Sequence, residues 1–139
     1  MRAVLDPNVL VSALLSGRGA PAQILERWLV GEFELVVSES LLAELERTLA
    51  YPKLRSRVSA QDAAAFVLLL RETALVRADP FGPPRRSPDP GDDYLLALAE
   101  AERAVLVSGD RHVLGLASRF PIENARGFLD LLERGSQRP

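Results

Sequence analysis

The sequence predicts one domain of the α/β class, built on a mainly parallel sheet of four to five strands that helices cover. Short apolar stretches bounded by turn residues alternate with longer segments of helical period, which is the pattern of such a sheet. The composition, 47% hydrophobic and 26% charged, is that of an ordinary globular protein. A chain of 139 residues is also long enough to bury one core without disulfides. We therefore interpret residues 1–139 as a single domain.

The predicted strands are short apolar runs bounded by turn residues. In chain order they cover residues 3–5, 34–37, 74–76 and 104–107, and a fifth strand lies near residues 121–122. The runs Ala-Val-Leu at 3–5 and Ala-Val-Leu-Val at 104–107 are apolar throughout, as expected of strands that are buried on both faces in a parallel sheet.

The predicted helices occupy the segments between the strands and cover residues 8–15, 20–30, 39–50, 60–73, 93–103 and 125–134. Two of them fall in the first crossover. The helix at 39–50 shows the clearest pattern, because it carries one leucine stripe and Ser38 or Ser40 can cap its start. Trp28 is expected in the core. Residues 79–91 contain five prolines and two glycines, and we expect them to form a loop at the rim of a site.

The composition excludes several kinds of chemistry. The chain has no cysteine, which excludes disulfides, thiolate zinc sites and a cysteine nucleophile. His112 is the single histidine, so mechanisms that need two histidines are excluded, and we interpret it as a polar surface residue. The net charge of −2 is not the basic balance of typical nucleic-acid binders, so any such role must be local. Carboxylates must therefore carry any acid, base or metal role.

The sequence shows no secretory signal and no membrane-spanning segment. Asp6 interrupts the first apolar stretch, and no cleavage site follows residues 9–15. The longest unbroken apolar run, residues 63–70, has 8 residues, whereas a membrane span needs about 18. We expect a cytoplasmic protein.

Two carboxylates follow predicted strands. Asp6 comes directly after the first strand, and Asp110 follows the fourth strand after Ser108 and Gly109. Ligands bind at the carboxyl ends of the strands in open parallel sheets. An aspartate at such a junction can also cap the next helix or organise a turn, and this alternative stays open for each residue taken alone.

Further carboxylates belong to two predicted helices. Asp92 and Asp93 open the helix at 93–103, and Asp89 lies three positions upstream. Glu44 and Glu46 flank the leucine stripe of the helix at 39–50, and helical spacing does not choose between them. Like charges held together raise one another's pKa unless a cation is present. Four carboxylates that converge from two strand ends and two helices would suit Mg²⁺ or Mn²⁺ and phosphoryl-transfer chemistry.

Nucleotide-binding motifs do not offer a better interpretation. Residues 17–22 match G-x-G-x-x-A, but they follow a predicted helix and not a strand, so we reject a dinucleotide site. A G-x-x-x-x-G-K-[ST] loop does not occur in the sequence.

The chain resembles PIN-domain proteins and, more narrowly, the VapC-like ribonucleases of bacterial toxin–antitoxin pairs. The resemblance spans nearly the whole chain and depends on the order of four segments, residues 3–12, 40–47, 92–99 and 106–110. It implies a three-layer α/β/α sandwich whose acids bind Mg²⁺ or Mn²⁺ and hydrolyse RNA phosphodiester bonds. By position it assigns as catalytic metal ligands Asp6, Glu44, Asp93 and Asp110.

The resemblance also selects Glu44 over Glu46 and implies that Asn8 and Ser108 orient the acids or a water. Pro7 departs from the family's usual Thr or Ser. A homodimer and an antitoxin partner are further implications. We also expect Arg85 and Arg86, just upstream of the acidic helix start, to contact RNA phosphate. The alternative is a weakly active or inactive PIN-like module that binds RNA or a protein without cleaving it.

Overall fold

The structure is a computed structural model that describes residues 1–136, so residues 137–139 of the predicted domain lie outside the described residues. Five parallel strands form one sheet in the order β3-β2-β1-β4-β5. Their bounds are Arg2–Leu5 for β1, Glu34–Val37 for β2, Leu75–Val76 for β3, Val105–Val107 for β4 and Ile122–Glu123 for β5. The predicted parallel sheet is confirmed, with strand ends that differ from the prediction by at most one residue.

Helices fill the connections as the periodicity predicts. The described residues contain α1 (Pro7–Leu15), α2 (Ala20–Leu29), α3 (Glu39–Leu49), α4 (Pro52–Arg55), α5 (Ala60–Thr73), the 3₁₀ turn η1 (Pro90–Asp92), α6 (Asp93–Ala101), α7 (Arg111–Leu114) and α8 (Ala125–Ser136). The sequence did not predict α4 or α7, because four residues are too few to show a helical period. The helix predicted to residue 103 ends at Ala101, and Arg103 adopts a left-handed φ of 52° in the turn that follows.

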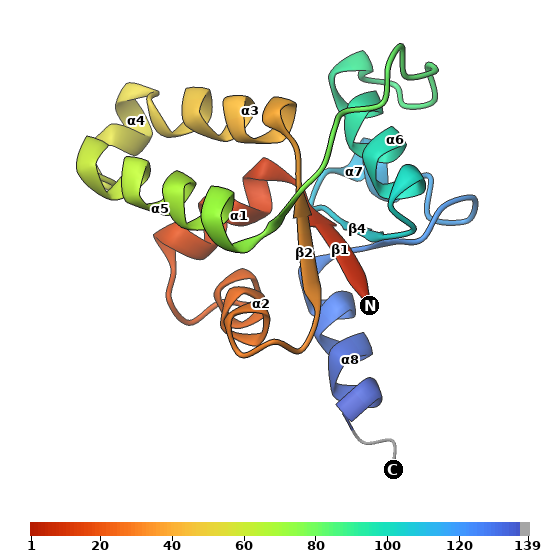
Figure 1. Cartoon of the computed structure of the whole chain (residues 1–139), viewed down its shortest axis with the longest axis horizontal. Helices are drawn as coiled ribbons and strands as arrows, with labels where there is room; N and C mark the ends of the chain where they lie inside the picture. The colour runs from red at the N-terminus through yellow and green to blue at the C-terminus, as the bar shows by residue number, and fades with distance from the viewer. Residues whose placement is uncertain (137–139) are drawn as a thin grey trace.

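The helices form two outer layers, which confirms the three-layer sandwich. In Figure 1, α1 to α5 lie on one side of the sheet, whereas α6 and α7 lie on the other. On the first side α1 packs against α2 and α3, and α3 packs against α5. On the second side α6 packs against β1 and β4. The helix α8 packs against α2, which lies on the first side, and against β5. None of the helices within residues 1–136 has the length and apolar character needed to cross a membrane.

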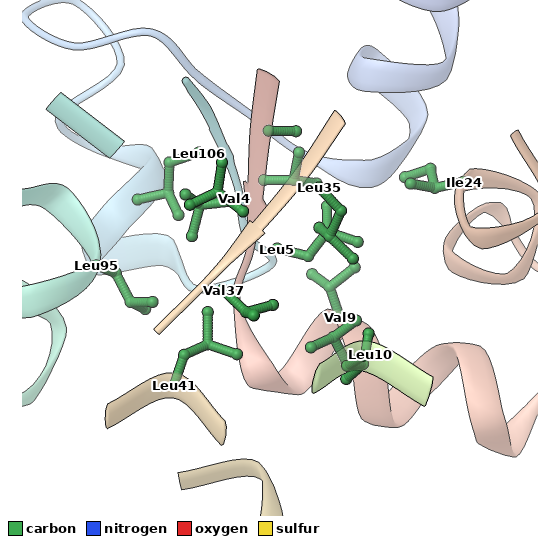
Figure 2. Packing of buried hydrophobic residues seen from close by; sticks show 14 of the residues in the cluster. Val4, Leu5, Val9, Leu10, Ile24, Leu35, Val37, Leu41, Leu95 and Leu106 are labelled. Atoms are coloured by element: carbon green, nitrogen blue, oxygen red, sulfur yellow. The ribbon is translucent and has the colours of Figure 1, made fainter. Parts of the chain in front are cut away.

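The core lies between the central strands and the helices on both sides. Figure 2 shows strand residues such as Leu5 and Val37 in one buried cluster with helix residues such as Val9 and Leu41. The predicted leucine stripe of α3 is at most 1% exposed, and Trp28 is 6% exposed, so both are core residues as predicted. Burying one such leucine contributes about 1.5–3 kcal/mol. This packing fixes the ends of β1 and β4, after which the predicted acids follow.

A long irregular segment joins β3 to α6, and it confirms the predicted loop up to Asp89. It crosses from the α5 side of the sheet to the α6 side (Figure 1). Two polar contacts attach its start. Arg77 Nε donates to Glu102 Oε1 at 3.1 Å, and the backbone N–H of Ser40 donates to Asp79 Oδ2 at 3.0 Å. The loop therefore reaches α6 along a defined path past the start of α3.

Candidate active site

Asp6 lies at the carboxyl edge of the sheet with both carboxylate oxygens held. The register pairs Leu5 with Val107, so Asp6 and Ser108 leave their strands side by side. Ser108 Oγ donates to Asp6 Oδ2 at 2.9 Å, and the backbone N–H of Asn8 donates to Oδ1 at 3.0 Å. Asp6 is only 3% exposed and caps the start of α1. Asp6 can therefore cap α1 and also belong to a group of acids at this edge of the sheet.

Burial raises the pKa of the Asp6 carboxyl above its usual value. The hydrogen bonds from the Asn8 backbone and the Ser108 hydroxyl act in the opposite direction, because they stabilise the charged form. The negative charges of Glu44 and Asp110 raise the pKa further. Asp6 is thus a buried acid close enough to two other carboxylates for their charges to act on it.

Asp110 is joined to Asp6 through the Ser108 hydroxyl. The backbone N–H of Asp110 donates to Ser108 Oγ at 3.0 Å, so one hydroxyl donates to Asp6 and accepts from Asp110. Asp110 Oδ1 accepts from the backbone N–H of His112 at 2.7 Å and caps α7. His112 itself is exposed, as predicted for a polar surface residue.

Glu44 faces α6 across the carboxyl edge. The Tyr94 hydroxyl donates to Glu44 Oε2, and both side chains are partly buried. Burial, followed by this hydrogen bond, raises the pKa of the Tyr94 hydroxyl, which keeps it a hydrogen-bond donor. Glu46, by contrast, is exposed and lines a groove beside Arg55 and Arg71. Sequence reasoning missed Tyr94, although its place directly after the two acids of the helix start was a usable signal.

The two adjacent acids at the start of α6 have different surroundings. Asp93 is 3% exposed, and its Oδ1 accepts from the backbone N–H groups of Arg86 and Ser87 at 3.0 and 2.8 Å. It therefore anchors the loop that precedes α6. Asp92 makes no side-chain cap hydrogen bond to the helix, and its Oδ2 is buried without a hydrogen-bond partner among the described residues.

Electrostatics group Asp92 with the predicted acids. Burial raises the pKa of Asp92, the negative charges of Asp110, Asp6, Asp89 and Glu44 raise it further in that order, and together they bring it to about 6. A second buried carboxylate oxygen without a partner, Asp79 Oδ1, belongs to the loop start beside α3. The unpartnered oxygen of Asp92, beside several acids, is the feature that a divalent cation would satisfy.

The acids surround a shared region without forming a closed ligand cage. Within residues 1–136 no group of three or more His, Asp or Glu side chains is placed closely enough to hold one ion. The donors present are carboxylate oxygens, which suit Mg²⁺ or Mn²⁺, and such ions keep several waters beside one or two protein carboxylates. The metal-ligand roles of Asp6, Glu44, Asp93 and Asp110 stay predictions.

The two arginines predicted to contact RNA differ in their surroundings. Arg85 is exposed. The Arg86 guanidinium lies 5.1 Å from the Phe120 ring centroid, and its Nη1 donates to both carboxylate oxygens of Glu100 at 3.0 Å. Its Nε and Nη2 are buried without a partner among the described residues. Arg86 is therefore engaged with α6 and the turn before β5, while Arg85 is available to a ligand.

Comparisons with known proteins agree with this architecture. The profile of the PIN domain matches residues 2–112. The uncharacterized protein MJ1680 of Methanocaldococcus jannaschii is 27% identical over 118 residues, which are 84% of this chain and 75% of that protein.

Two solved structures share the fold at low sequence identity. VapBC2 from Rickettsia felis, bound to a DNA fragment from its promoter, has a TM-score of 0.61 and 19% identity and covers 89% of this chain and 98% of that chain. VapBC-1 from nontypeable Haemophilus influenzae has a TM-score of 0.62 and 16% identity, with coverages of 91% and 99%. The resemblance predicted from the four segments is confirmed, and the chain belongs to the PIN domain family.

Proposed function

We propose that the protein is an endoribonuclease that hydrolyses RNA phosphodiester bonds with Mg²⁺ or Mn²⁺ at its acidic cluster. PIN domains are a nuclease family that generally uses divalent metal ions, so the family supports this class of reaction. The observation that carries the proposal is the convergence of Asp6, Glu44, Asp92 and Asp110 at one edge of the sheet, where their charges act on one another.

The residues present fit a divalent cation. Their oxygens are hard ligands, and the buried, unpartnered oxygen of Asp92 lacks the positive charge or donor that burial demands. When bound, the cation would supply a water nucleophile at neutral pH and stabilise charge at the phosphate. Ser108 would hold Asp6 in place, and Tyr94 would hold Glu44.

We propose Asp92 as the fourth acid in place of Asp93, which the family pattern assigned. The Asp93 carboxylate is already occupied by two backbone N–H groups, and its part would be to hold the loop that leads to Asp92. Asp92, in contrast, has a free buried oxygen and is affected by the charges of the other three acids.

The decisive experiment is a cleavage assay with purified protein and single-stranded RNA. We expect hydrolysis in Mg²⁺ or Mn²⁺, none in chelator, and a loss of orders of magnitude in Asp6→Asn, with Asp62→Asn on the exposed start of α5 as the matched control. RNA binding without hydrolysis in every metal would instead support the binding-module alternative.

We further propose that the protein is the cytoplasmic toxin of a toxin–antitoxin pair and forms a homodimer. The fold shared with two VapBC structures supports the antitoxin partner. Leu68 and Leu69 on α5 are 53% and 39% exposed, and this apolar surface supports self-association. Light scattering after size exclusion should give twice the mass of the chain, and Leu68→Asp should give the monomer.

A further inference from the structure

A surface hollow of about 290 Å³ adjoins the acidic cluster on the side of α1. Its walls include Asn8 and Ser12 of α1, Pro21 of α2, Gly109 and Asp110 after β4, and Ala125 of α8. Asp110 belongs to both the hollow and the acidic cluster, and the backbone N–H of Asn8 donates to Asp6. A molecule that occupies the hollow would therefore lie directly beside the acids.

The hollow presents two hydrogen-bonding side chains, those of Asn8 and Ser12. Asn8 and Ser12 lie one turn apart on the same face of α1, and both are exposed. Neither side chain makes a hydrogen bond to another residue in the described part of the chain. An amide and a hydroxyl can each donate and accept, so they match the mixed donors and acceptors of a base edge or a ribose hydroxyl.

The other walls determine the chemical class of the ligand. Val9, Pro21 and Ala125 supply apolar surface, and no lysine or arginine lines the hollow. The one charged group on its walls is Asp110, which would repel a phosphate. An uncharged, partly apolar group with hydrogen-bonding edges fits this lining, and a nucleobase with its ribose is such a group.

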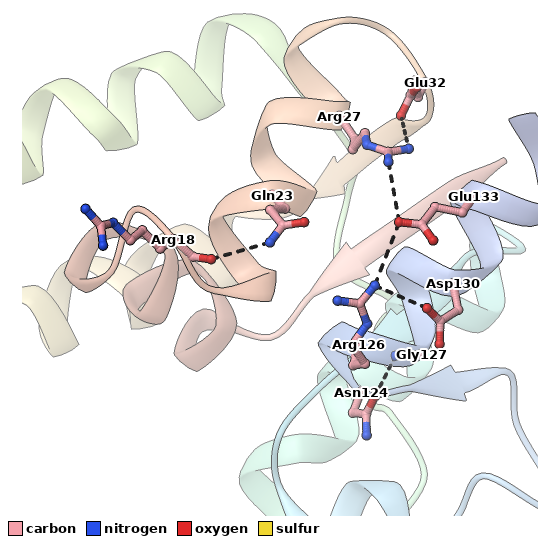
Figure 3. A network of polar contacts seen from close by, with 9 residues as sticks. All are labelled: Arg18, Gln23, Arg27, Glu32, Asn124, Arg126, Gly127, Asp130 and Glu133. Carbon is pink, nitrogen blue, oxygen red and sulfur yellow. Dashed lines mark hydrogen bonds and ion pairs between the residues drawn. The ribbon is translucent and has the colours of Figure 1, made fainter.

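The walls are held together by contacts outside the site. Figure 3 shows α2 and α8 joined through Glu133, whose Oε1 lies 3.7 Å from Arg27 Nη2 and 3.8 Å from Arg126 Nη2. Exposed pairs of this kind contribute little stability, and the two helices are held in place mainly by their packing, in which Ile24 and Phe128 are fully buried. The hollow is therefore a preformed feature of the packed helices.

We propose that this hollow is a subsite that binds one base, with its ribose, of a single-stranded RNA next to the scissile phosphate. Single-stranded RNA can turn an unstacked base into such a hollow, whereas a base within a duplex cannot reach it. The subsite rests on RNA being the substrate, as proposed above. It would give the enzyme a preference for the nucleotide on one side of the cut.

The test uses Ser12→Phe, which fills the hollow, and Ser12→Ala, which removes one hydroxyl. Ser118→Phe is the matched control, because Ser118 is exposed and lies outside the hollow. Binding of a short fluorescein-labelled single-stranded RNA is measured by anisotropy in chelator. Losing the contacts to one base should raise Kd about tenfold in Ser12→Phe, and losing one hydrogen bond should raise it about fivefold in Ser12→Ala. Stabilisation by Mn²⁺, measured as a melting shift, should equal that of the parent in all three variants.

The outcomes separate the subsite from the nuclease activity. RNA affinity in Ser12→Phe equal to that of the parent overturns the subsite, and so does a loss of the Mn²⁺ shift, because the substitution would then act through the acids. If Ser12→Phe weakens RNA binding while the parent hydrolyses no RNA in any metal, the subsite stands and the proposed nuclease function fails.

Discussion

Replacing Asp92 with asparagine should stabilise the metal-free protein, whereas replacing Asp93 with asparagine should destabilise it. The partly buried charge of Asp92 costs free energy, whereas the Asp93 carboxylate holds the loop that precedes α6. The pKa of Asp92 is raised from 3.8 to about 6. Each pKa unit is worth about 1.4 kcal/mol, so the charge at Asp92 costs up to about 3 kcal/mol at neutral pH, which solvent screening at this partly exposed group reduces to about 1 kcal/mol. Asp92→Asn removes that cost.

The pH dependence follows from the sign of the shift. A raised pKa means that the folded protein holds the Asp92 proton more tightly than the unfolded chain does. The penalty is therefore absent below about pH 4, grows up to about pH 6 and is complete above it. Without metal at about pH 7, Asp92→Asn should melt about 3–5 °C above the parent. This gain should disappear near pH 4.

With Mn²⁺ bound, the parent should be more stable than Asp92→Asn, the reverse of the order without metal. The parent gains stability from Mn²⁺ by mass action, whereas Asp92→Asn lacks one ligand and should gain much less. Asp93→Asn keeps an oxygen that accepts from Arg86 and Ser87 but loses its charge, so it should lose about 1 kcal/mol with or without metal and keep most of its activity. Thermal melts and RNA cleavage by both variants, with Asp62→Asn as control, check this.

The reverse result would refute the reasoning. If Asp93→Asn loses the Mn²⁺ shift and the cleavage while Asp92→Asn keeps both, the fourth acid is Asp93, as the family pattern assigned. If neither variant changes activity or the metal shift, both residues only cap or anchor local structure.

Three further predictions concern side chains around the acids. Tyr94→Phe removes the hydroxyl that donates to Glu44, a hydrogen bond to a charged group that contributes about 1.5–3 kcal/mol. Thermal stability, measured by melting, and Mn²⁺ affinity, measured by calorimetry, should both fall. Arg86→Ala removes the contact with the Phe120 ring and an ion pair, so urea unfolding should show a loss of about 1–2 kcal/mol. Arg85→Glu should leave unfolding unchanged but weaken RNA binding, and it should lower the salt slope of log Kd by about one.

Each of these predictions has a control within the chain. Tyr51 is 59% exposed, so Tyr51→Phe should leave metal affinity at the parent value. If it weakens Mn²⁺ binding as much as Tyr94→Phe does, the contact with Glu44 is not the cause. Arg85→Ala serves the same purpose for the stability of Arg86→Ala. An RNA salt slope that Arg85→Glu does not change would show that Arg85 lies outside the RNA path.

Much of the fold and part of the site follow from local sequence rules. Asp6 and Asp110 could be placed together because parallel strands share one carboxyl edge, and the sheet confirms this placement. Asp92 and Asp93 could not be told apart, because neighbouring residues at a helix start differ only in side-chain direction. That direction depends on the path of the loop from β3, which long-range contacts such as that of Asp79 with Ser40 determine. The pairing of Arg86 with Phe120 is equally non-local.

The Ser108 hydroxyl, which bonds to both Asp6 and Asp110, has a consequence for folding during synthesis. The hydrogen bond from Ser108 to Asp6 joins residues 102 positions apart, so Asp6 cannot accept it until β4 has been synthesised and has paired with β1. Closing a loop of that length must precede any stabilisation by the contacts it brings together. A chain emerging from the ribosome therefore carries Asp6 and Glu44 long before it can assemble their partners. The proposed nuclease activity would therefore begin only after β4 has paired with β1.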